Sequence, residues 1–267
     1  QLSDNGYFVG AIDKKKSSVE YALKNGLIQV GETSVKKDFV KDFDLIVFAL
    51  YPHDFINWIK EYQSSIKSGA LITDVTGVKS FVVENVQKIL RGDLEFVGAH
   101  PMAGKEVSGV ENADPIIFVG ANYIVTPTKK NTDENVQAVK DLGHALGFER
   151  ISSLSPEEHD ETVGFLSHLT HCIAVSLMVS KKSHHLAEYT GDSFRDLTRI
   201  AKINDEMWSE LFLANKDELL KQMDLFEEKF NQLKEDIKND NREKIRETLR
   251  ESTARRKVFD KDAKETK

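Results

Sequence analysis

The feature that most constrains the fold is a change of pattern near residue 152. Before it, short runs rich in β-branched and aromatic residues alternate with helical patterns; after it, only long helical patterns follow. Such an alternation predicts a doubly wound, mostly parallel α/β sheet followed by an all-α segment. The expected strands cover residues 7–12, 45–50, 70–73, 95–98, 122–126 and 148–151, and the expected helices cover 16–25, 54–66, 78–90 and 132–146.

The all-α segment has a clear start. Ser155 is placed as an N-cap, Pro156 as the first helical residue and Glu158 as the partner in a capping box. We expect helices over 153–256 and a frayed tail over 257–267. Apolar residues at steps of three and four predict an amphipathic helix that packs on its own domain or on a partner subunit. They are Met223, Phe226, Phe230, Leu233 and Ile237.

Composition excludes several classes of protein. The net charge of −7 argues against a nucleic-acid partner, because such binding depends on neutralising phosphates. The single cysteine, Cys172, cannot form an internal disulfide, which suits a reducing compartment. We find no apolar run approaching the ~20 residues of a membrane span and no signal peptide at the start. The sequence therefore predicts a cytoplasmic protein with no membrane partner.

Asp13 closes the first expected strand. An acidic residue at this place in a mononucleotide-binding unit hydrogen-bonds the ribose of NAD, although an aspartate that merely starts a loop stays an alternative. Lysines at positions 14–16 could accept a 2′-phosphate, so NADP stays open. No stretch matches the G-x-G-x-x-G turn of such domains. We therefore expect residues 1–152 to form a Rossmann-like nucleotide-binding domain without its first strand, in a fragment of a longer protein.

His100 lies between a short expected strand and Pro101, in a predicted loop at the carboxyl edge of the sheet, where such folds bind ligands. A histidine there can exchange a proton, and its unperturbed pKa near ~6.5 predicts one ionisation at that pH. His168 and His171 share a helical face, but no third ligand accompanies them. The sequence therefore predicts no metal site.

Several motifs in this order closely resemble the prephenate dehydrogenase family. Each motif is weak alone, but together they span most of the chain, from residue 7 to about residue 237. They are residues 74–79 (DVTGVK), 98–106 (GAHPMAGKE), 155–160 (SPEEHD), 167–171 (SHLTH) and 194–201 (FRDLTRIA), with Met207 and Trp208 after them.

The resemblance implies an NAD(P)-dependent oxidative decarboxylation of prephenate to 4-hydroxyphenylpyruvate and CO2, in tyrosine biosynthesis. It also implies a homodimer formed by the helical domain. His100 would accept the proton of the substrate's ring hydroxyl, and Arg199 would bind a substrate carboxylate. The other implied site residues are His171 and Trp208 at the substrate, Glu106 near the site entrance, and a supporting network of His159, Asp160 and Arg195.

Two departures from the family pattern keep alternatives open. Gly77 stands where several relatives carry a serine, and the neighbouring Thr76 could supply the missing hydroxyl. Without a glycine-rich turn the pyrophosphate has no seat, so a catalytically inactive, NAD-responsive or dimerising module stays an alternative. An arogenate dehydrogenase is another, since it shares the fold and the catalytic histidine. His171 favours prephenate on family grounds.

Overall fold

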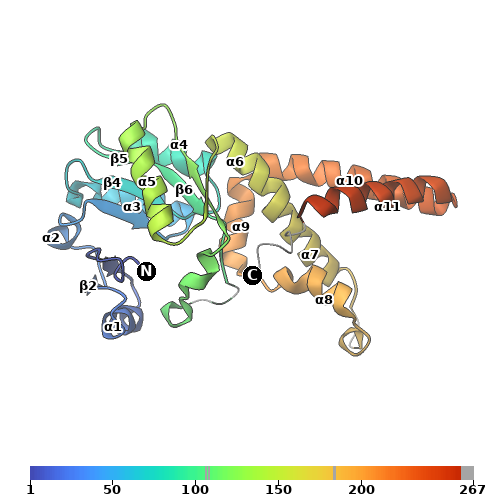
Figure 1. Cartoon of the computed structure of the whole chain (residues 1–267), viewed down its shortest axis with the longest axis horizontal. Coiled ribbons are helices and arrows are strands. Elements are labelled where there is room, and N and C mark those ends of the chain that lie inside the picture. The colour runs from blue at the N-terminus through green and yellow to red at the C-terminus, as the bar shows by residue number, and fades with distance from the viewer. Residues whose placement is uncertain (106, 108, 183–184, 260–267) are drawn as a thin grey trace. The chain divides into compact units, whose positions relative to one another are not determined.

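The computed structural model describes residues 1–105, 107, 109–182 and 185–259 (Figure 1). The chain forms two compact units, Gln1–Leu219 and Leu220–Lys267. The first unit contains the α/β part and the helices that follow it as far as Ala214. The predicted domain boundary near residue 152 lies inside this unit and stays a prediction. Most of the predicted frayed tail lies outside the described residues.

The strands of the first unit form three sets of hydrogen-bonded neighbours. Within these sets every pair is parallel except the β6–β7 pair. Val97 N donates to the Ile72 carbonyl (3.0 Å), so the chain remains beside β4 as it passes from β5 to β6. In order within the sets, the strands are β1 (Gly10–Ile12) and β2 (Val30–Glu32); β3 (Leu45–Phe48), β4 (Leu71–Asp74) and β5 (Glu95–Phe96); and β6 (Gly98–Pro101), β7 (Asn122–Thr126) and β8 (Arg150–Ser153).

His100 lies on a strand, and the prediction of a loop at this position was wrong. β6 continues through His100 because it pairs with β7, with His100 opposite Ile124. An antiparallel partner of this kind is not visible in a strand–helix alternation, which predicts parallel pairing. The sequence also missed β2, a strand of three residues with a glycine at its centre.

The helices divide between the two parts of the chain as the sequence predicts. Those of the α/β part are α1 (Lys16–Lys24), α2 (Lys37–Val40), α3 (Pro52–Tyr62), α4 (Ser80–Ile89) and α5 (Asp133–Ala145). Those that follow are α6 (Pro156–Val163), the π-helical segment η4 (Gly164–Leu169), α7 (Thr170–Val179), α8 (Asp192–Thr198), α9 (Asp205–Ala214), α10 (Lys216–Lys238) and α11 (Arg242–Arg256). The predicted capping box is present, with Glu158 N donating to Ser155 Oγ (3.1 Å) and Ser155 N to Glu158 Oε2 (2.8 Å).

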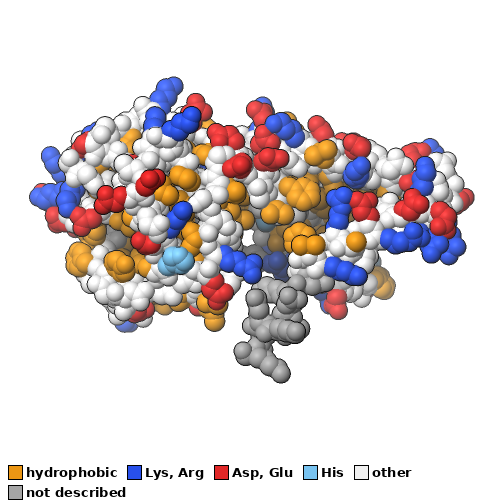
Figure 2. All heavy atoms as spheres, turned by 45° about the horizontal axis from the view of Figure 1, so that its top comes forward, with side chains coloured by type: hydrophobic (Ala, Val, Ile, Leu, Met, Phe, Trp, Pro, Cys, Tyr) orange, Lys and Arg blue, Asp and Glu red, His pale blue; other side chains and the backbone are white. Residues whose placement is uncertain are grey.

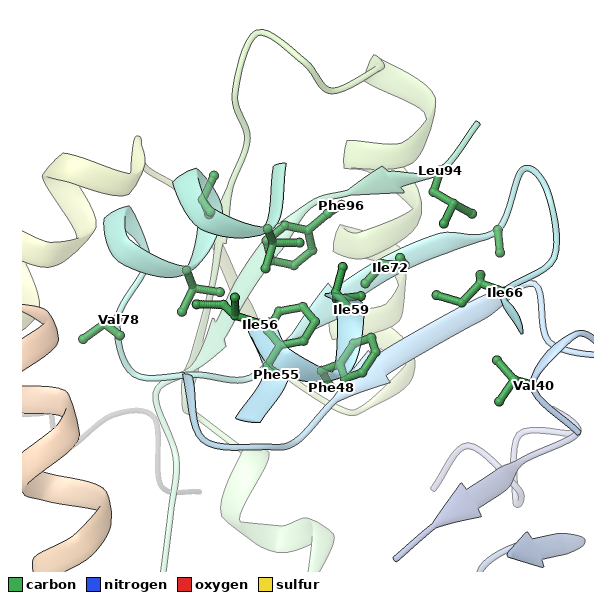
Figure 3. Packing of buried hydrophobic residues seen from close by; sticks show 14 of the residues in the cluster. Val40, Phe48, Phe55, Ile56, Ile59, Ile66, Ile72, Val78, Leu94 and Phe96 are labelled. Atoms are coloured by element: carbon green, nitrogen blue, oxygen red, sulfur yellow. The ribbon is translucent and has the colours of Figure 1, made fainter. Parts of the chain in front are cut away.

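Two hydrophobic clusters cover opposite faces of the sheet, as expected for a doubly wound fold. Side chains alternate between the two faces of a strand. On β4, accordingly, Ile72 belongs to the cluster formed with α3 and α4 (Figure 3), while Leu71 belongs to the cluster formed with α5. The rings of Phe48 and Phe55 stack with centroids 4.2 Å apart in the first cluster. Burying each such ring contributes ~1.5–3 kcal/mol.

The continuous helical run Pro156–Val179 is long and apolar enough, by length and composition, to cross a membrane. This corrects the prediction that no apolar run approaches that length. The same run carries polar side chains that are buried inside the first unit, among them His159 and His168. Buried, hydrogen-bonded polar groups of this kind are also found in the core helices of soluble proteins.

Part of the surface of the helical region is apolar (Figure 2). On the run Pro156–Val179 the exposed hydrophobic side chains are Phe165, Leu166, Met178 and Val179. On α10 the predicted amphipathic stripe is present, and four of its five members are exposed, namely Met223, Phe226, Phe230 and Ile237. On α10 this exposed apolar stripe at helical spacing is typical of a helix face that another surface covers.

Candidate active site

A line of three side chains joins β6 to the first helix after the sheet. His100 Nδ1 lies 2.8 Å from His159 Nε2, and His159 Nδ1 lies 2.7 Å from Asp160 Oδ1. His159 and Asp160 are buried, whereas His100 is half-buried. His100 Nε2 makes no hydrogen bond within the described residues. The line therefore ends in the Nε2 atom of His100, which is available to a ligand as far as the described residues show.

The start of α4 fixes the carboxylate of Asp160. Its two oxygens accept the backbone N–H groups of Lys79 and Ser80, each at 2.8 Å. Burial raises the pKa of Asp160, but the hydrogen bonds from His159, Lys79 and Ser80 outweigh it and lower the pKa below its usual value. Asp160 is therefore a carboxylate, and a helix N-terminus is a favourable place for its negative charge.

Both histidines of the line are held neutral. Burial, followed by the neighbouring His159 and the charge of Lys79, lowers the pKa of His100 well below the usual histidine value. Burial also lowers the pKa of His159, and Lys79 adds to this effect while Asp160 opposes it. A neutral imidazole at position 100 can accept a proton without first losing one. The ionisation near pH 6.5 predicted for His100 from its unperturbed pKa is therefore displaced to more acidic pH.

A buried ion pair lies beside this line. Lys79 Nζ donates to Asp74 Oδ2 (2.5 Å) and to Thr76 Oγ1 (2.9 Å), and the side chains of Lys79 and Asp74 are fully buried. The other oxygen of Asp74 accepts Ala99 N (3.0 Å), next to His100. Removing either member of a buried pair leaves an uncompensated buried charge and destabilises the fold. Thr76 thus joins the candidate site through Lys79.

Two glycines allow the close packing around His100. A Cβ on Gly98 would lie 2.6 Å from Thr126 Oγ1 and 3.4 Å from Lys79 Cδ, so this position has no room for one. A Cβ on Gly77 would meet Leu211 at 3.4 Å and His100 Cε1 at 4.0 Å, which are ordinary contact distances. A Cβ would therefore fit at position 77, next to the His100 ring.

A second group of side chains joins the helices. The rings of His171 and Trp208 stack with centroids 3.7 Å apart, and His171 Nδ1 donates to the Ser167 carbonyl (2.8 Å). His168 lies edge-on to Trp208 at 6.1 Å, and its Nδ1 is 3.2 Å from Asn215 Nδ2. Asn215 also donates to the Asp160 carbonyl (2.9 Å), which links this group to the histidine line.

Three of the remaining predicted site residues are exposed, and the fourth is not described. Arg195 is exposed and pairs with Asp192 (3.4 Å), and Arg199 is exposed in the short turn after α8. Asp13 is exposed at the end of β1. Glu106 lies outside the described residues. The roles that the resemblance implies for these four residues stay predictions.

Sequence reasoning did not single out Lys79, Asp74 and Asn215, although the first two lie in a motif that carries the family resemblance. A lysine among polar residues usually indicates a solvent-exposed position. The only available signal was the spacing of Asp74, Thr76 and Lys79 after a buried strand, which places three polar side chains at one carboxyl edge.

The carboxyl end of β1 offers part of a nucleotide site. Asp13 Oδ1 accepts Lys15 N (2.7 Å), and Asp13 Oδ2 makes no hydrogen bond within the described residues. An exposed carboxylate oxygen at this edge fits the hydroxyls of an adenosine ribose. The 267 residues contain no glycine-rich turn for the pyrophosphate. The residues present therefore fit the adenosine end of NAD, but they include no glycine-rich turn to bind its phosphates.

Comparison with known families identifies both parts of the chain. The model described as "Prephenate dehydrogenase, nucleotide-binding domain" matches residues 2–150, and the one described as "Prephenate dehydrogenase, dimerization domain" matches residues 155–251. Fold and site thus define a Rossmann-like nucleotide-binding protein with a helical dimerization domain. The chain belongs to the prephenate dehydrogenase family, which confirms the resemblance found in the sequence.

Individual relatives agree with this assignment. The prephenate dehydrogenase of Bacillus subtilis is 34% identical over 80% of this chain and 58% of its own length, and that of Lactococcus lactis is 32% identical over 79% and 59%. The chain thus spans about three fifths of the length of these curated relatives. A crystal structure of Aquifex aeolicus prephenate dehydrogenase, in complex with hydroxyphenyl propionate and NAD+, is 33% identical. It superposes with a TM-score of 0.88 over 97% of this chain and 92% of that one.

Proposed function

We propose that this chain carries the catalytic site of a prephenate dehydrogenase, which oxidises prephenate with NAD to 4-hydroxyphenylpyruvate and CO2. The observation that carries the proposal is the half-buried His100, whose Nδ1 is engaged by His159 and whose Nε2 makes no hydrogen bond within the described residues. An imidazole held neutral in this way suits the removal of a hydroxyl proton. The family assignment supplies the substrate class.

His100 is the general base of the proposed reaction. Its Nε2 takes the proton of the ring hydroxyl as that hydroxyl becomes a carbonyl, and the ring becomes aromatic when CO2 leaves. NAD, when bound, supplies the hydride acceptor. Asp13 would hold the adenosine ribose of the cofactor at the end of β1, and its negative charge would disfavour a 2′-phosphate, so we propose NAD rather than NADP.

The substrate carries two carboxylates and a ring. We propose that Arg199 binds one carboxylate, because its guanidinium donates two parallel hydrogen bonds and stays charged at any working pH. We propose that His171 and Trp208 lie beside the ring of the substrate, where Trp208 offers an apolar surface and His171 a polar one. Their rings stack with centroids 3.7 Å apart, which supports a shared position in the site. Glu106 near the entrance, Arg195 in the supporting network, and Thr76 as the source of a hydroxyl complete the proposed set.

We further propose a cytoplasmic homodimer formed by the helical domain, residues 153–256, which follows a nucleotide-binding domain of residues 1–152. The match to a dimerization domain supports the dimer, as do the exposed apolar side chains of the run Pro156–Val179 and of α10. A second subunit covering these faces would remove the apolar surface from water. Light scattering should give the mass of two chains at micromolar concentration, and a mass of one chain would contradict the dimer.

The deciding experiment is an assay of NADH formation. The full-length protein is purified and mixed with NAD and prephenate, and the absorbance of NADH is followed, with arogenate as the second substrate and His100→Asn as the control variant. We expect NADH with prephenate and at least a hundredfold less with the variant. NADH with arogenate alone would favour the arogenate dehydrogenase reading, and no NADH with either substrate would contradict the proposed activity.

A further inference from the structure

The hydrogen bonds of the histidine line determine which ring nitrogen carries each proton. The carboxylate of Asp160 can only accept, so His159 carries its proton on Nδ1, which lies 2.7 Å from Asp160 Oδ1. The Nε2 of a neutral His159 is then an acceptor. It lies 2.8 Å from His100 Nδ1, so His100 must donate from that nitrogen. His100 Nε2 consequently bears the lone pair.

The charged and titratable groups around the two rings come from several elements. Asp160 on α6 faces His159 directly. Lys79, at the start of α4, lies close to both rings together with its partner Asp74 from β4, and His168 of the π-helical segment is also nearby. Asp160 therefore provides a carboxylate in direct contact with a histidine of the line, at His159. The carboxylate of Asp74 instead accepts hydrogen bonds from Lys79, Thr76 and Ala99 N.

We propose that His159 is a second proton acceptor, so that the site moves two protons for each hydroxyl proton it removes. This inference rests on the proposed function, in which His100 is the base. The hydroxyl proton of the substrate binds to His100 Nε2, while the proton on His100 Nδ1 passes to His159 Nε2. His100 ends neutral with its proton on Nε2, and His159 ends as an imidazolium that donates to Asp160. The hydride leaves separately to NAD.

Charge placement explains why the second transfer is favourable. A cation on His100 would be partly buried with Lys79 nearby and, among the described residues, without a carboxylate in contact. A cation on His159 would lie 2.7 Å from a carboxylate that two backbone N–H groups already fix in place. An opposite charge at this distance favours the charged form of an imidazole. The relay thus moves the positive charge to the one ring in contact with Asp160.

The first test needs no activity. Two-dimensional NMR of the protein labelled with 15N-histidine reports which nitrogen of each ring is protonated. We expect His100 and His159 both to carry the proton on Nδ1 in the free protein at pH 7.5. A His100 that is protonated on Nε2 would overturn the proposal, because it would then have no lone pair for the substrate proton. This test stands even if the assay with prephenate shows that the proposed function is wrong.

The second test separates proton transfer from simple orientation. In His159→Gln the side-chain oxygen can still accept from His100 Nδ1, but it cannot take up a proton. His159→Leu can do neither, and His144→Gln on the exposed face of α5 is the matched control. We expect kcat to fall by about a hundredfold in His159→Gln, at the lower end of what a positioned acid–base group contributes, and to be unchanged in His144→Gln. Unaltered kcat in a folded His159→Gln would overturn the relay and leave His159 an orienting residue.

The solvent isotope effect gives a readout that an orienting role would not change. With two protons in flight, the rate of the wild-type protein should depend on the deuterium fraction of the solvent along a curve with a quadratic term. In His159→Gln the dependence should be linear, because one proton moves. A linear dependence in the wild-type protein, measured where the chemical step limits the rate, would contradict the two-proton step. Were His159→Gln to fail to fold, the wild-type curve and the NMR measurement would still decide.

Discussion

Glu210 Oε1 accepts the backbone N–H of His53 at 2.7 Å and lies 2.6 Å from the Nδ1 of the same residue. His53 is in the first turn of α3, in the α/β part, and Glu210 is on α9, one of the helices that follow it. One carboxylate oxygen thus ties the two parts together within the first compact unit. An acidic group is favourable at a helix N-terminus, where backbone N–H groups lack partners.

Glu210→Ala should destabilise the first unit by ~1 kcal/mol, because it removes the acceptor of an exposed helix N–H. Glu210→Gln should lose less, since its amide oxygen can still accept from His53 N. Chemical denaturation of both variants measures the difference. Equal stability of Glu210→Ala and the wild-type protein would show that the contact contributes nothing.

His100 should make the pH dependence unusual for a histidine base. Only the neutral ring can accept a proton, and burial with the nearby His159 and Lys79 lowers its pKa well below the usual value. We therefore expect kcat/KM for prephenate to be flat from pH 8 down to about pH 6.5, the ordinary histidine value, and to fall only at more acidic pH. His100→Asn should abolish this acid limb. A limb centred at or above pH 6.5 would contradict the assignment.

Arg199→Ala should raise KM for prephenate at least tenfold and change kcat little. A hydrogen bond to a charged group contributes ~1.5–3 kcal/mol, and a carboxylate is bound equally in the ground state and the transition state. Steady-state kinetics measure both constants. Arg150→Ala, which changes an exposed arginine of β8 outside the proposed site, is the matched comparison. A loss confined to kcat would assign Arg199 a different role.

Stability should decline as the pH falls below 6.5. The pKa of His168 is lowered to about 4, chiefly by burial, and burial also lowers the pKa of His100 and His159. Between these values and the unfolded value near ~6.5, the unfolded chain binds more protons, so acid favours unfolding. His168 alone accounts for about 3 kcal/mol between pH 6.5 and 4. Urea unfolding at several pH values should show this slope, shallower in His168→Gln but unaltered in the exposed His144→Gln.

Gly98→Ala should be among the most damaging small substitutions. The added methyl would lie 2.6 Å from Thr126 Oγ1 and 3.1 Å from Val83 Cγ2, inside a closely packed region that includes Lys79. Overpacking of this kind costs ~1–3 kcal/mol. Gly92→Ala is the control, since nothing lies within 4 Å of its added methyl. Thermal unfolding that gives the same midpoint for both variants would contradict the packing argument.

The architecture was readable from the sequence because it depends on local pattern. The strand at 122–126 was predicted with its observed bounds, and the capping box at Ser155 has the predicted hydrogen bonds. The antiparallel pairing of β6 was not readable, since it depends on which strand lies next to His100 in space. The same limit applied to β2, whose three residues are too few for a periodic pattern.

The candidate site was predictable only in its parts. The family motifs indicated His100, His159 and Asp160, and the structure joins them at 2.8 and 2.7 Å. The buried state of Lys79 and the lowered pKa of His100 follow from packing among β4, β6 and α4, which no single motif encodes. Arg199 lies on an exposed turn, and its predicted role is to bind a carboxylate of the substrate.

The π-helical segment Gly164–Leu169 sets the helical phase between the two groups of site residues. It lies between Asp160, which ends the histidine line, and His171, which stacks on Trp208. Each residue of an α-helix turns the chain by about 100°, and a π segment holds one residue more per hydrogen-bonded turn. If the same residues formed a regular α-helix instead, everything after them would be rotated by about that angle. The histidine line and the His171–Trp208 group would then each be intact, but they would no longer face the same substrate.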